Sequence, residues 1–172
     1  MSEKSEKKNW KLDATDHKIL RFLQLDAKIT NTQLAKEIDL SPAPTLERVR
    51  RLELNGFIES YHAVLNAEKI GLGVTTFVQV SLQSHKRAVV DSFISQIAEI
   101  ENIVECHHLT GQADFLLKIL AKDITSYQVL MLNVSEIDEI KTMQSMVVLA
   151  TFKNSMLLPM PEVINVEETV QL

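Results

Sequence analysis

The sequence predicts an α+β protein with two domains of different architecture, and three observations lead to this prediction. Residues 13–57 hold three helical patterns in succession, each preceded by a residue suited to capping. Residues 73–155 alternate between strand and helix patterns in the order βαββαβ. Charge is divided as well: residues 1–66 carry 11 Lys/Arg against 10 Asp/Glu, and residues 67–172 carry 7 against 13. At 172 residues the chain is long enough for two small domains.

The first two helices are predicted from their caps and their apolar spacing. Asp13 is placed to cap a helix whose apolar stripe is formed by Ile19, Leu20 and Leu23. Thr30 and Gln33 have the spacing of a capping box, in which each side chain accepts a backbone N–H of the other residue. The box starts a short helix over residues 32–38, after which Asp39 turns the chain. The small core is expected to be closed by Ile29, Leu40 and Ile58.

The third helix, over residues 41–53, has an apolar side and an arginine-rich side. Ser41 suits the N-cap through its hydroxyl, and Pro42 suits the first helical position. At about 100° per residue, the apolar side is formed by Leu46, Val49 and Leu52, with Glu53 beside them. The outer side and its flanks carry Pro44, Glu47, Arg48, Arg50 and Arg51. The short turn before this helix predicts a helix-turn-helix; the simpler alternative is a helical hairpin whose arginines are only solvated.

A helix-turn-helix places its second helix in the major groove of DNA, with the first residues of that helix beside the base edges. Here those residues are small and mostly apolar, which predicts a loose sequence preference. Arg48 and Arg51 are expected to make the strong contacts, and Arg50 and Lys36 to touch the backbone. Glu47 is expected to pair with Arg51, or else to accept from a cytosine amino group. The predicted DNA-binding set is Gln33, Lys36, Ser41, Pro42, Thr45, Arg48, Arg50 and Arg51.

Composition limits the partners and the compartment. The first half is only mildly basic, so we expect DNA affinity to come from several weakly binding heads on one assembly. No apolar run approaches the roughly 20 residues of a membrane helix, and residues 2–8 lack the apolar segment of a signal peptide. A cytoplasmic protein with no membrane partner is expected. Cys106 is the only cysteine, which excludes an intrachain disulfide framework, and it is interpreted as a small apolar strand residue; no metal is expected.

The second half is predicted to be a ferredoxin-like domain. Gly56 can end the third helix, and residues 58–65 are interpreted as an extended strand or wing linking the halves. Strands are expected over residues 76–82, 103–109, 114–121 and 141–152, and helices over 86–100 and 124–134. This order is the split-βαβ arrangement, an antiparallel sheet with helices on one face. The other face, carrying Val78, Val80, Leu117 and Ile119 or their alternating neighbours, needs a cover, and the same sheet of a second subunit is the simplest one.

The predicted organisation has five parts. They are a flexible N-terminal arm (1–12), a winged helix-turn-helix domain (13–57), a linker strand (58–72), the ferredoxin-like domain (73–155) and a tail (156–172). The apolar start of the tail, residues 156–160, can extend the contact with a second subunit. The acidic remainder has no useful periodicity, and no function is assigned to it.

These residues resemble the Lrp/AsnC family of transcription regulators from about Leu12 to Ser155. Residues 40–53, Gly56-Phe57-Ile58 and Glu105-Cys106-His107 are most similar to its leucine-responsive branch. The resemblance implies dimers formed by the ferredoxin-like domains, assembled into rings that often hold eight subunits, a homo-octamer that wraps double-stranded DNA. It also implies that a free amino acid binds where dimers meet.

The effector site that the resemblance implies centres on the hairpin loop 110–114. Gly111 lets backbone approach closely, and Asp114 can meet an ammonium group. The full implied set is His108, Thr110, Gly111, Gln112, Ala113 and Asp114, with Gln144 and Ser145 supplied by the neighbouring dimer. Many family members have an acidic and an aromatic residue where this chain has Gln112 and Ala113. The larger, less charged pocket favours leucine or methionine as effector and no other cofactor; the alternative is a plain hairpin turn without ligand.

Two other functions occur on a similar fold. Tetrapyrrole decarboxylases have a similar fold, and His107-His108 resembles such a site, but adjacent strand residues point to opposite faces and no chelating or nucleophile–base set is visible. An enzyme is therefore not expected. A nucleoid-type DNA-packing protein that ignores small molecules shares the fold and differs only in whether loop 110–114 binds a ligand.

Overall fold

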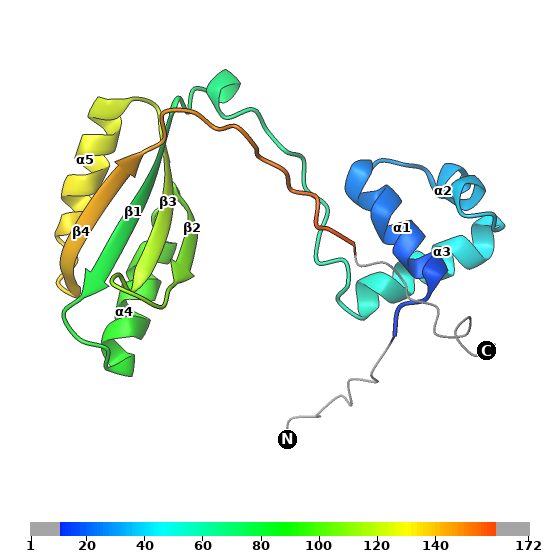
Figure 1. Cartoon of the computed structure of the whole chain (residues 1–172), viewed down its shortest axis with the longest axis horizontal. Helices are drawn as coiled ribbons and strands as arrows, with labels where there is room; N and C mark the ends of the chain where they lie inside the picture. The colour runs from blue at the N-terminus through cyan, green and yellow to red at the C-terminus, as the bar shows by residue number, and fades with distance from the viewer. Residues whose placement is uncertain (1–10, 161–172) are drawn as a thin grey trace, which may run out of the picture. The chain divides into compact units, whose positions relative to one another are not determined.

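The computed structural model describes residues 11–160, which form two compact units (Figure 1). The first unit comprises residues 11–63 together with 154–160, and the second unit comprises residues 64–153. Most of the predicted arm (1–12) and the tail beyond residue 160 lie outside the described residues. None of the described helices is long and apolar enough to cross a membrane.

Three helices form the first unit: α1 (Ala14–Leu25), α2 (Asn31–Glu37) and α3 (Pro42–Leu54). The predicted caps of α1 and α2 are confirmed, since Asp13 accepts the N–H of Asp16 and Thr30 forms a capping box with Gln33. The core between the helices is built on four buried side chains, Ile19, Leu34, Ile38 and Leu52. The predicted closing residues Ile29, Leu40 and Ile58 are partly buried against it.

Helix α3 starts as predicted, but its first turn is stabilised differently. The Ser41 hydroxyl makes no capping hydrogen bond. Instead its carbonyl oxygen accepts the Thr45 hydroxyl at 2.9 Å, and Thr45 is fully buried. Leu46, expected on the inner side, is 40% exposed. Val49 and Leu52 lie on the inner side as predicted, whereas Thr45 takes the place expected of Leu46, because its hydroxyl is satisfied within its own helix and it can face the core.

The end of α3 agrees with the prediction, whereas the expected wing strand does not form. Gly56 has a φ of 74°, the left-handed conformation that ends a helix. Within the described chain, residues 58–65 are extended but are not part of any strand. The Tyr61 hydroxyl donates to Glu53 at 2.9 Å, which ties this segment to α3. Burial, together with this hydrogen bond, raises the pKa of Tyr61 to about 12.

The second unit has the predicted βαββαβ order. Its elements are β1 (Val74–Leu82), α4 (Arg87–Ala98), β2 (Ile103–His108), β3 (Phe115–Ala121), α5 (Ile124–Ser135) and β4 (Ile140–Val147), preceded by a 3-10 turn over Glu68–Ile70. The sheet order is β2-β3-β1-β4, and each neighbouring pair is antiparallel. The last strand is shorter than the predicted 141–152. Beyond Val147 the chain leaves the sheet, and Phe152 is 98% exposed.

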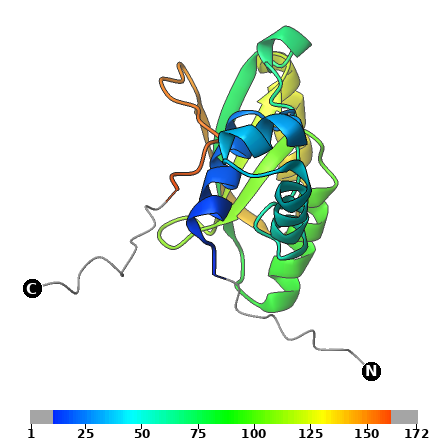
Figure 2. The ribbon, with the colours of Figure 1, turned by 90° about the vertical axis from the view of Figure 1, so that its right-hand side faces the viewer.

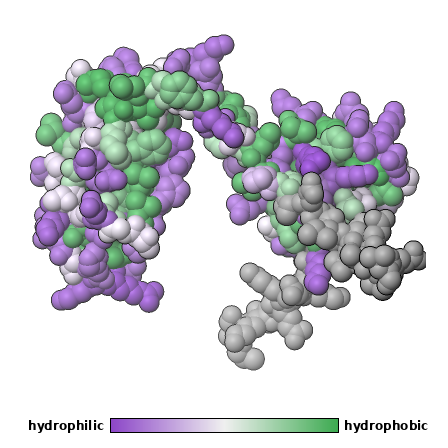
Figure 3. Space-filling model, viewed as in Figure 1, coloured by the Kyte–Doolittle hydropathy of each residue, from purple (hydrophilic) through white to green (hydrophobic). Residues whose placement is uncertain are grey.

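Both helices pack on one face of this sheet (Figures 1 and 2). That face carries the buried side chains Val78, Val80, Leu117 and Ile119, so the helices cover the first of the two predicted registers. The alternating neighbours form the other face, here called the open face, which includes Phe77, Gln79, Glu105, His107, Leu116, Lys118, Gln144 and Met146. Apolar and polar residues are intermixed on the side of the second unit that Figure 3 shows.

The chain returns to the first unit after β4. The side-chain amide of Gln24, near the end of α1, bonds both backbone groups of Leu158. Its oxygen accepts the Leu158 N–H at 2.7 Å, and its nitrogen donates to the Leu158 carbonyl at 3.5 Å. The start of the predicted tail therefore lies with the first unit.

Candidate functional site

The first turn of α3 is an accessible surface of small side chains. Ser41, Pro42, Ala43 and Pro44 are all exposed. The turn is held in place from behind, since the Asn31 side chain donates to the Pro42 carbonyl at 2.7 Å and Thr45 is buried beneath it. Ser41 and Pro42 are therefore accessible to a partner, whereas the buried Thr45 is not.

Two predicted phosphate contacts are free cations. Lys36 on α2 and Arg50 on α3 are exposed, and neither forms an ion pair with any residue of the described chain. Gln33 is exposed too, but its side-chain oxygen already accepts the Thr30 N–H and hydroxyl, at 3.1 and 2.8 Å. Only its amide nitrogen remains for a ligand.

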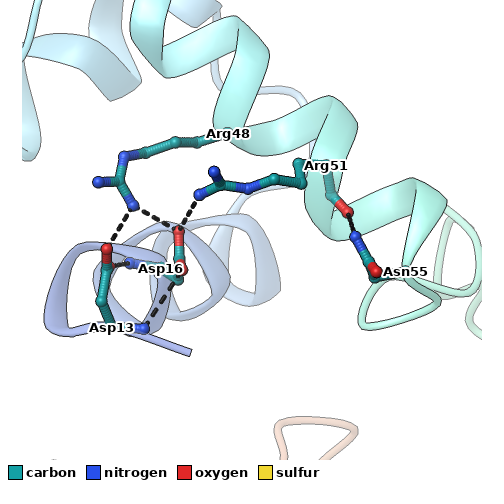
Figure 4. Close-up of polar contacts among 5 residues, drawn as sticks. All are labelled: Asp13, Asp16, Arg48, Arg51 and Asn55. Atoms are coloured by element: carbon teal, nitrogen blue, oxygen red, sulfur yellow. Dashed lines mark hydrogen bonds and ion pairs between the residues drawn. The ribbon is translucent and has the colours of Figure 1, made fainter. Parts of the chain in front are cut away.

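Arg48 and Arg51 turn toward α1 (Figure 4). One nitrogen of Arg48 lies 2.7 Å from Asp13 Oδ2 and 2.8 Å from Asp16 Oδ1. Arg51 lies 3.7 Å from the same oxygen of Asp16. The Asp16 side chain is fully buried, whereas that of Asp13 is half exposed. These four side chains, here called the aspartate–arginine network, join the start of α1 to the middle of α3.

Asp13 and Arg48 stabilise each other's charged forms. Burial raises the pKa of Asp13, but hydrogen bonds from Arg48 and from the Asp16 N–H, with the Arg48 charge, outweigh burial and leave this pKa below its usual value. The hydrogen bond to Asp13 raises the pKa of Arg48 despite its partial burial, and Asp16 adds to that effect. Each partner thus favours the charged form of the other.

This geometry changes the interpretation of α3. Arg48 and Arg51 were expected to be the strongest DNA contacts, and Arg51 was expected to pair with Glu47. Arg51 instead faces Asp16, and Arg48 bridges two carboxylates of another helix. The spacing of Asp13 and Asp16 at the start of α1 was a visible signal. However, a pattern within α3 cannot show that its arginines face acids 32 to 35 positions away in sequence.

The hairpin loop between β2 and β3 is fixed by Asp114. The Asp114 N–H donates to the Val80 carbonyl at 2.9 Å, and its carboxylate accepts the Leu82 N–H at 2.7 Å. The other carboxylate oxygen faces His85 Nδ1 at 3.5 Å. Gly111 has a φ of 131°, which a residue with a side chain rarely adopts. Asp114 therefore anchors the loop to β1 and keeps one oxygen accessible beside a histidine.

The implied effector residues divide into two groups. His108 stacks on Phe115 beside the loop, with ring centroids 4.8 Å apart, and the loop residues Thr110, Gly111 and Gln112 are exposed. Gln144 and Ser145 lie on β4, opposite Gln79 and Val78, so that they face opposite sides of the sheet. Ser145 accepts the hydroxyl of Tyr127 on α5. Within one chain, Ser145 therefore faces the helices, whereas Gln144 lies on the open face.

The two adjacent histidines also face opposite sides, as predicted. His107 pairs with Leu116 on the open face, and His108 pairs with the core residue Phe115. His107 lies 3.2 Å from Glu105, whose other oxygen accepts Lys118 at 2.7 Å. Lys118 and then His107 lower the pKa of Glu105. Among residues 11–160, no group of three His, Cys, Asp or Glu side chains is arranged to hold a metal ion.

Two family models match the two units. Residues 12–59 match a winged helix-turn-helix DNA-binding domain, and residues 75–158 match the Lrp/AsnC ligand-binding domain. Together these matches cover α1 to α3 and the whole sheet with its helices.

The chain is also similar to curated proteins and to solved structures. The chain is 42% identical over 120 residues to the leucine-responsive regulatory protein of Klebsiella pneumoniae, covering 70% of this chain and 73% of that protein. Among solved structures, a transcriptional regulator from Neisseria meningitidis in complex with L-methionine has a TM-score of 0.83 at 31% identity, covering 87% of this chain and 97% of that one. An AsnC family regulator from Agrobacterium tumefaciens has a TM-score of 0.82 at 30% identity, covering 86% and 97%.

Proposed function

Because this chain belongs to the Lrp/AsnC family of transcription regulators, we propose that it binds operator DNA through α3 and responds to a free amino acid bound at the β2–β3 hairpin. The chain is a DNA-binding regulator with a ligand-binding domain, and the family is not one of enzymes. We propose that it binds genomic DNA in the cytoplasm.

The exposed first turn of α3 carries the DNA-binding part of the proposal. Ser41 and Pro42 are positioned as a helix-turn-helix positions its base-edge residues, and the cations of Lys36 and Arg50 are available for phosphates. Small apolar side chains contact thymine methyl groups and follow the shape of the DNA groove, and they form few of the hydrogen bonds that distinguish one base pair from another. We therefore propose a loose operator preference in which phosphate contacts position the helix.

The open face supports the proposed assembly. Phe77 and Leu116 lie at its centre and are only half-buried in a single chain. A second copy related by a two-fold axis covers such a face with the same residues. We propose that this contact forms the dimer and that dimers assemble further into a homo-octamer. Such an assembly brings several helix-turn-helix domains to one DNA molecule.

The effector is proposed to be a small apolar amino acid, leucine or methionine. The Neisseria meningitidis relative is described in complex with L-methionine, and here the exposed Gln112 and half-buried Ala113 leave the loop without an acidic or aromatic side chain. One Asp114 oxygen is used by the Leu82 N–H, so only the other, beside His85, is available for an ammonium group. The proposed site also uses His108, Thr110 and Gly111, with Gln144 and Ser145 from a neighbouring dimer.

Calorimetric titration of the full-length protein with each of the twenty amino acids tests the ligand. We expect saturable binding of leucine or methionine and a changed mobility shift on operator DNA when that amino acid is present. Binding of acidic or basic amino acids alone contradicts the proposed pocket. Replacing Gly111 with valine forces a strained backbone and is expected to abolish ligand binding while DNA binding persists.

A second candidate is an effector-independent DNA-packing protein. The observation that favours it is the engagement of Asp114 with Leu82, since a carboxylate that anchors the loop is sufficient for a purely structural hairpin. DNA mobility shifts that are identical with and without every amino acid, together with flat titrations, favour this candidate over the regulator.

A further inference from the structure

Asp16 is a carboxyl group buried inside the first unit and paired with arginines of α3. Its side chain has no exposed surface, and a buried carboxylate is stable only when cations and hydrogen-bond donors compensate for the lost water. Among residues 11–160, the cations paired with Asp16 are Arg48 and Arg51, which both belong to α3. The buried carboxyl group of α1 therefore depends on the placement of the helix that carries the proposed DNA-binding surface.

Both carboxylate oxygens of Asp16 make contacts. Its Oδ1 lies 2.8 Å from Arg48 and 3.7 Å from Arg51, while its Oδ2 accepts the backbone N–H of Asp13 at 3.2 Å (Figure 4). Asp13 in turn accepts the Asp16 N–H at 2.8 Å and holds Arg48 at 2.7 Å. The capping box of α1 and the cations of α3 are thus parts of one connected set of hydrogen bonds.

Two cations on one helix determine how that helix is rotated. Arg48 and Arg51 are three positions apart and lie on the same side of α3. When both face Asp16, the exposed Arg50 lies away from that contact. A rotation of α3 that brought Arg48 into a DNA groove would separate it from two carboxylates and leave Asp16 with less compensation.

We propose that Asp16 is a positioning residue for DNA recognition: it fixes the rotation of α3 against α1 and keeps Arg48 and Arg51 out of the groove. The inference rests on the DNA-binding function proposed above. Sequence preference then depends on a residue that touches no DNA, because the first turn of α3 meets the base edges only at one rotation.

The test compares Asp16→Asn and Arg48→Gln in the full-length protein. The probes are a duplex selected by the wild-type protein from a random pool and an unselected duplex of equal length. We expect each change to lower the affinity ratio of these duplexes about tenfold, as one misplaced base contact does. The double variant is expected to be no worse than either single one, because both break the same link. Asp26→Asn, which removes an exposed charge at the far end of α1, is the matched control and should keep the ratio.

Salt dependence separates positioning from direct contact. Each lost phosphate contact reduces the slope of log K against log salt by about 0.9. Arg48→Gln is expected to leave this slope unchanged, whereas Arg50→Gln, which removes an exposed cation, is expected to reduce it by about that amount. A merely structural role of Asp16 would weaken binding to both duplexes together, in proportion to the unfolded fraction.

Specific outcomes overturn the inference. A wild-type duplex ratio in Asp16→Asn, with a reduced salt slope in Arg48→Gln, would show that Arg48 contacts DNA and that Asp16 does not position α3. If Asp16→Asn does not fold, Asp13→Asn decides, since asparagine retains the cap and loses one anion of Arg48. Its ratio is expected to fall about threefold, and wild-type ratios in both Asp13→Asn and Arg48→Gln overturn the proposal. A wild-type protein that binds no duplex at low salt refutes the proposed function instead.

Discussion

The two units differ in how completely one chain satisfies its own polar and apolar groups. In the first unit, the buried carboxylate of Asp16 pairs with Arg48 and Arg51 of the same unit, and the residues of the first turn of α3 are exposed. In the second unit, the open face keeps half-buried apolar side chains, and Gln144 and Ser145 face opposite sides of the sheet. The proposed DNA-binding surface is thus formed within one chain, whereas the proposed ligand site and the proposed cover of the open face take residues from another copy.

Disrupting the open face is expected to have the largest effect. Leu116→Lys places a charge at the centre of the proposed dimer contact, so the protein should become monomeric in analytical ultracentrifugation. DNA affinity should fall by about a hundredfold or more, because a monomer has only one DNA-binding domain. Ile94→Lys is the control, since Ile94 is an exposed apolar residue of α4 on the other side of the sheet. A dimeric Leu116→Lys protein would contradict the assigned interface.

Core truncations test whether the units unfold separately. Leu52→Ala removes a buried side chain of the first unit and is expected to cost about 2–5 kcal/mol. Calorimetry should show one transition lowered and the transition of the second unit unchanged. Phe93→Ala in α4 should have the opposite pattern, at about 3–5 kcal/mol. Equal shifts of both transitions in either variant would mean that the units unfold as one.

Truncation of the loop anchor is expected to have a smaller effect. Asp114→Ala leaves the N–H of the nearly buried Leu82 without its acceptor, which costs about 1–3 kcal/mol. Only the transition of the second unit should be lowered, and amide exchange at Leu82 should become faster. Gln112→Ala is the control, because its side chain is exposed. Unaltered exchange at Leu82 would show that Asp114 does not hold the loop.

The smallest expected effect is a pH dependence that separates the units. Asp13 and Glu105 have lowered pKa values in the folded protein, so each stabilises its unit fully above its unfolded value, near 4. This contribution is lost as pH falls through the lower folded value. Asp13→Asn should therefore lower the first transition at neutral pH, by less than about 1 kcal/mol because the group is half exposed, and should have no effect in strong acid.

Glu105→Gln provides the corresponding change in the second unit. Lys118 and His107 hold Glu105 on the open face, so only the second transition should lose acid sensitivity. A variant whose melting temperature differs from the wild type by the same amount at every pH would contradict the charge pairing in its unit.

Patterns that depend on neighbours in sequence could be predicted, and those that depend on distant partners could not. The caps at Asp13 and Thr30 and the βαββαβ order follow from local spacing, and the structure confirms them. The inner side of α3 was predicted correctly at Val49 and Leu52 but not at Leu46, because Thr45 donates its hydroxyl to the Ser41 carbonyl and faces the core instead. The direction of Arg48 was missed, because its carboxylate partners belong to another helix.

The candidate ligand loop illustrates the same division. A glycine with positive φ at position 111 follows from a tight turn between two strands. The engagement of Asp114 with Leu82 depends on β1 lying beside β3, which no single segment of sequence reveals. Similarly, residues 58–65 have the alternation of a strand, but within the described chain no neighbouring strand pairs with them.

The contact between Gln24 and Leu158 makes the second unit an insertion within the first. The polypeptide leaves the first unit after residue 63 and returns to it at residue 154, so two covalent connections, and not one, link the two units. One connection follows α3 and the other ends on α1. A protease cut near the exposed Phe152 would therefore break one of these connections while leaving both units attached through the other.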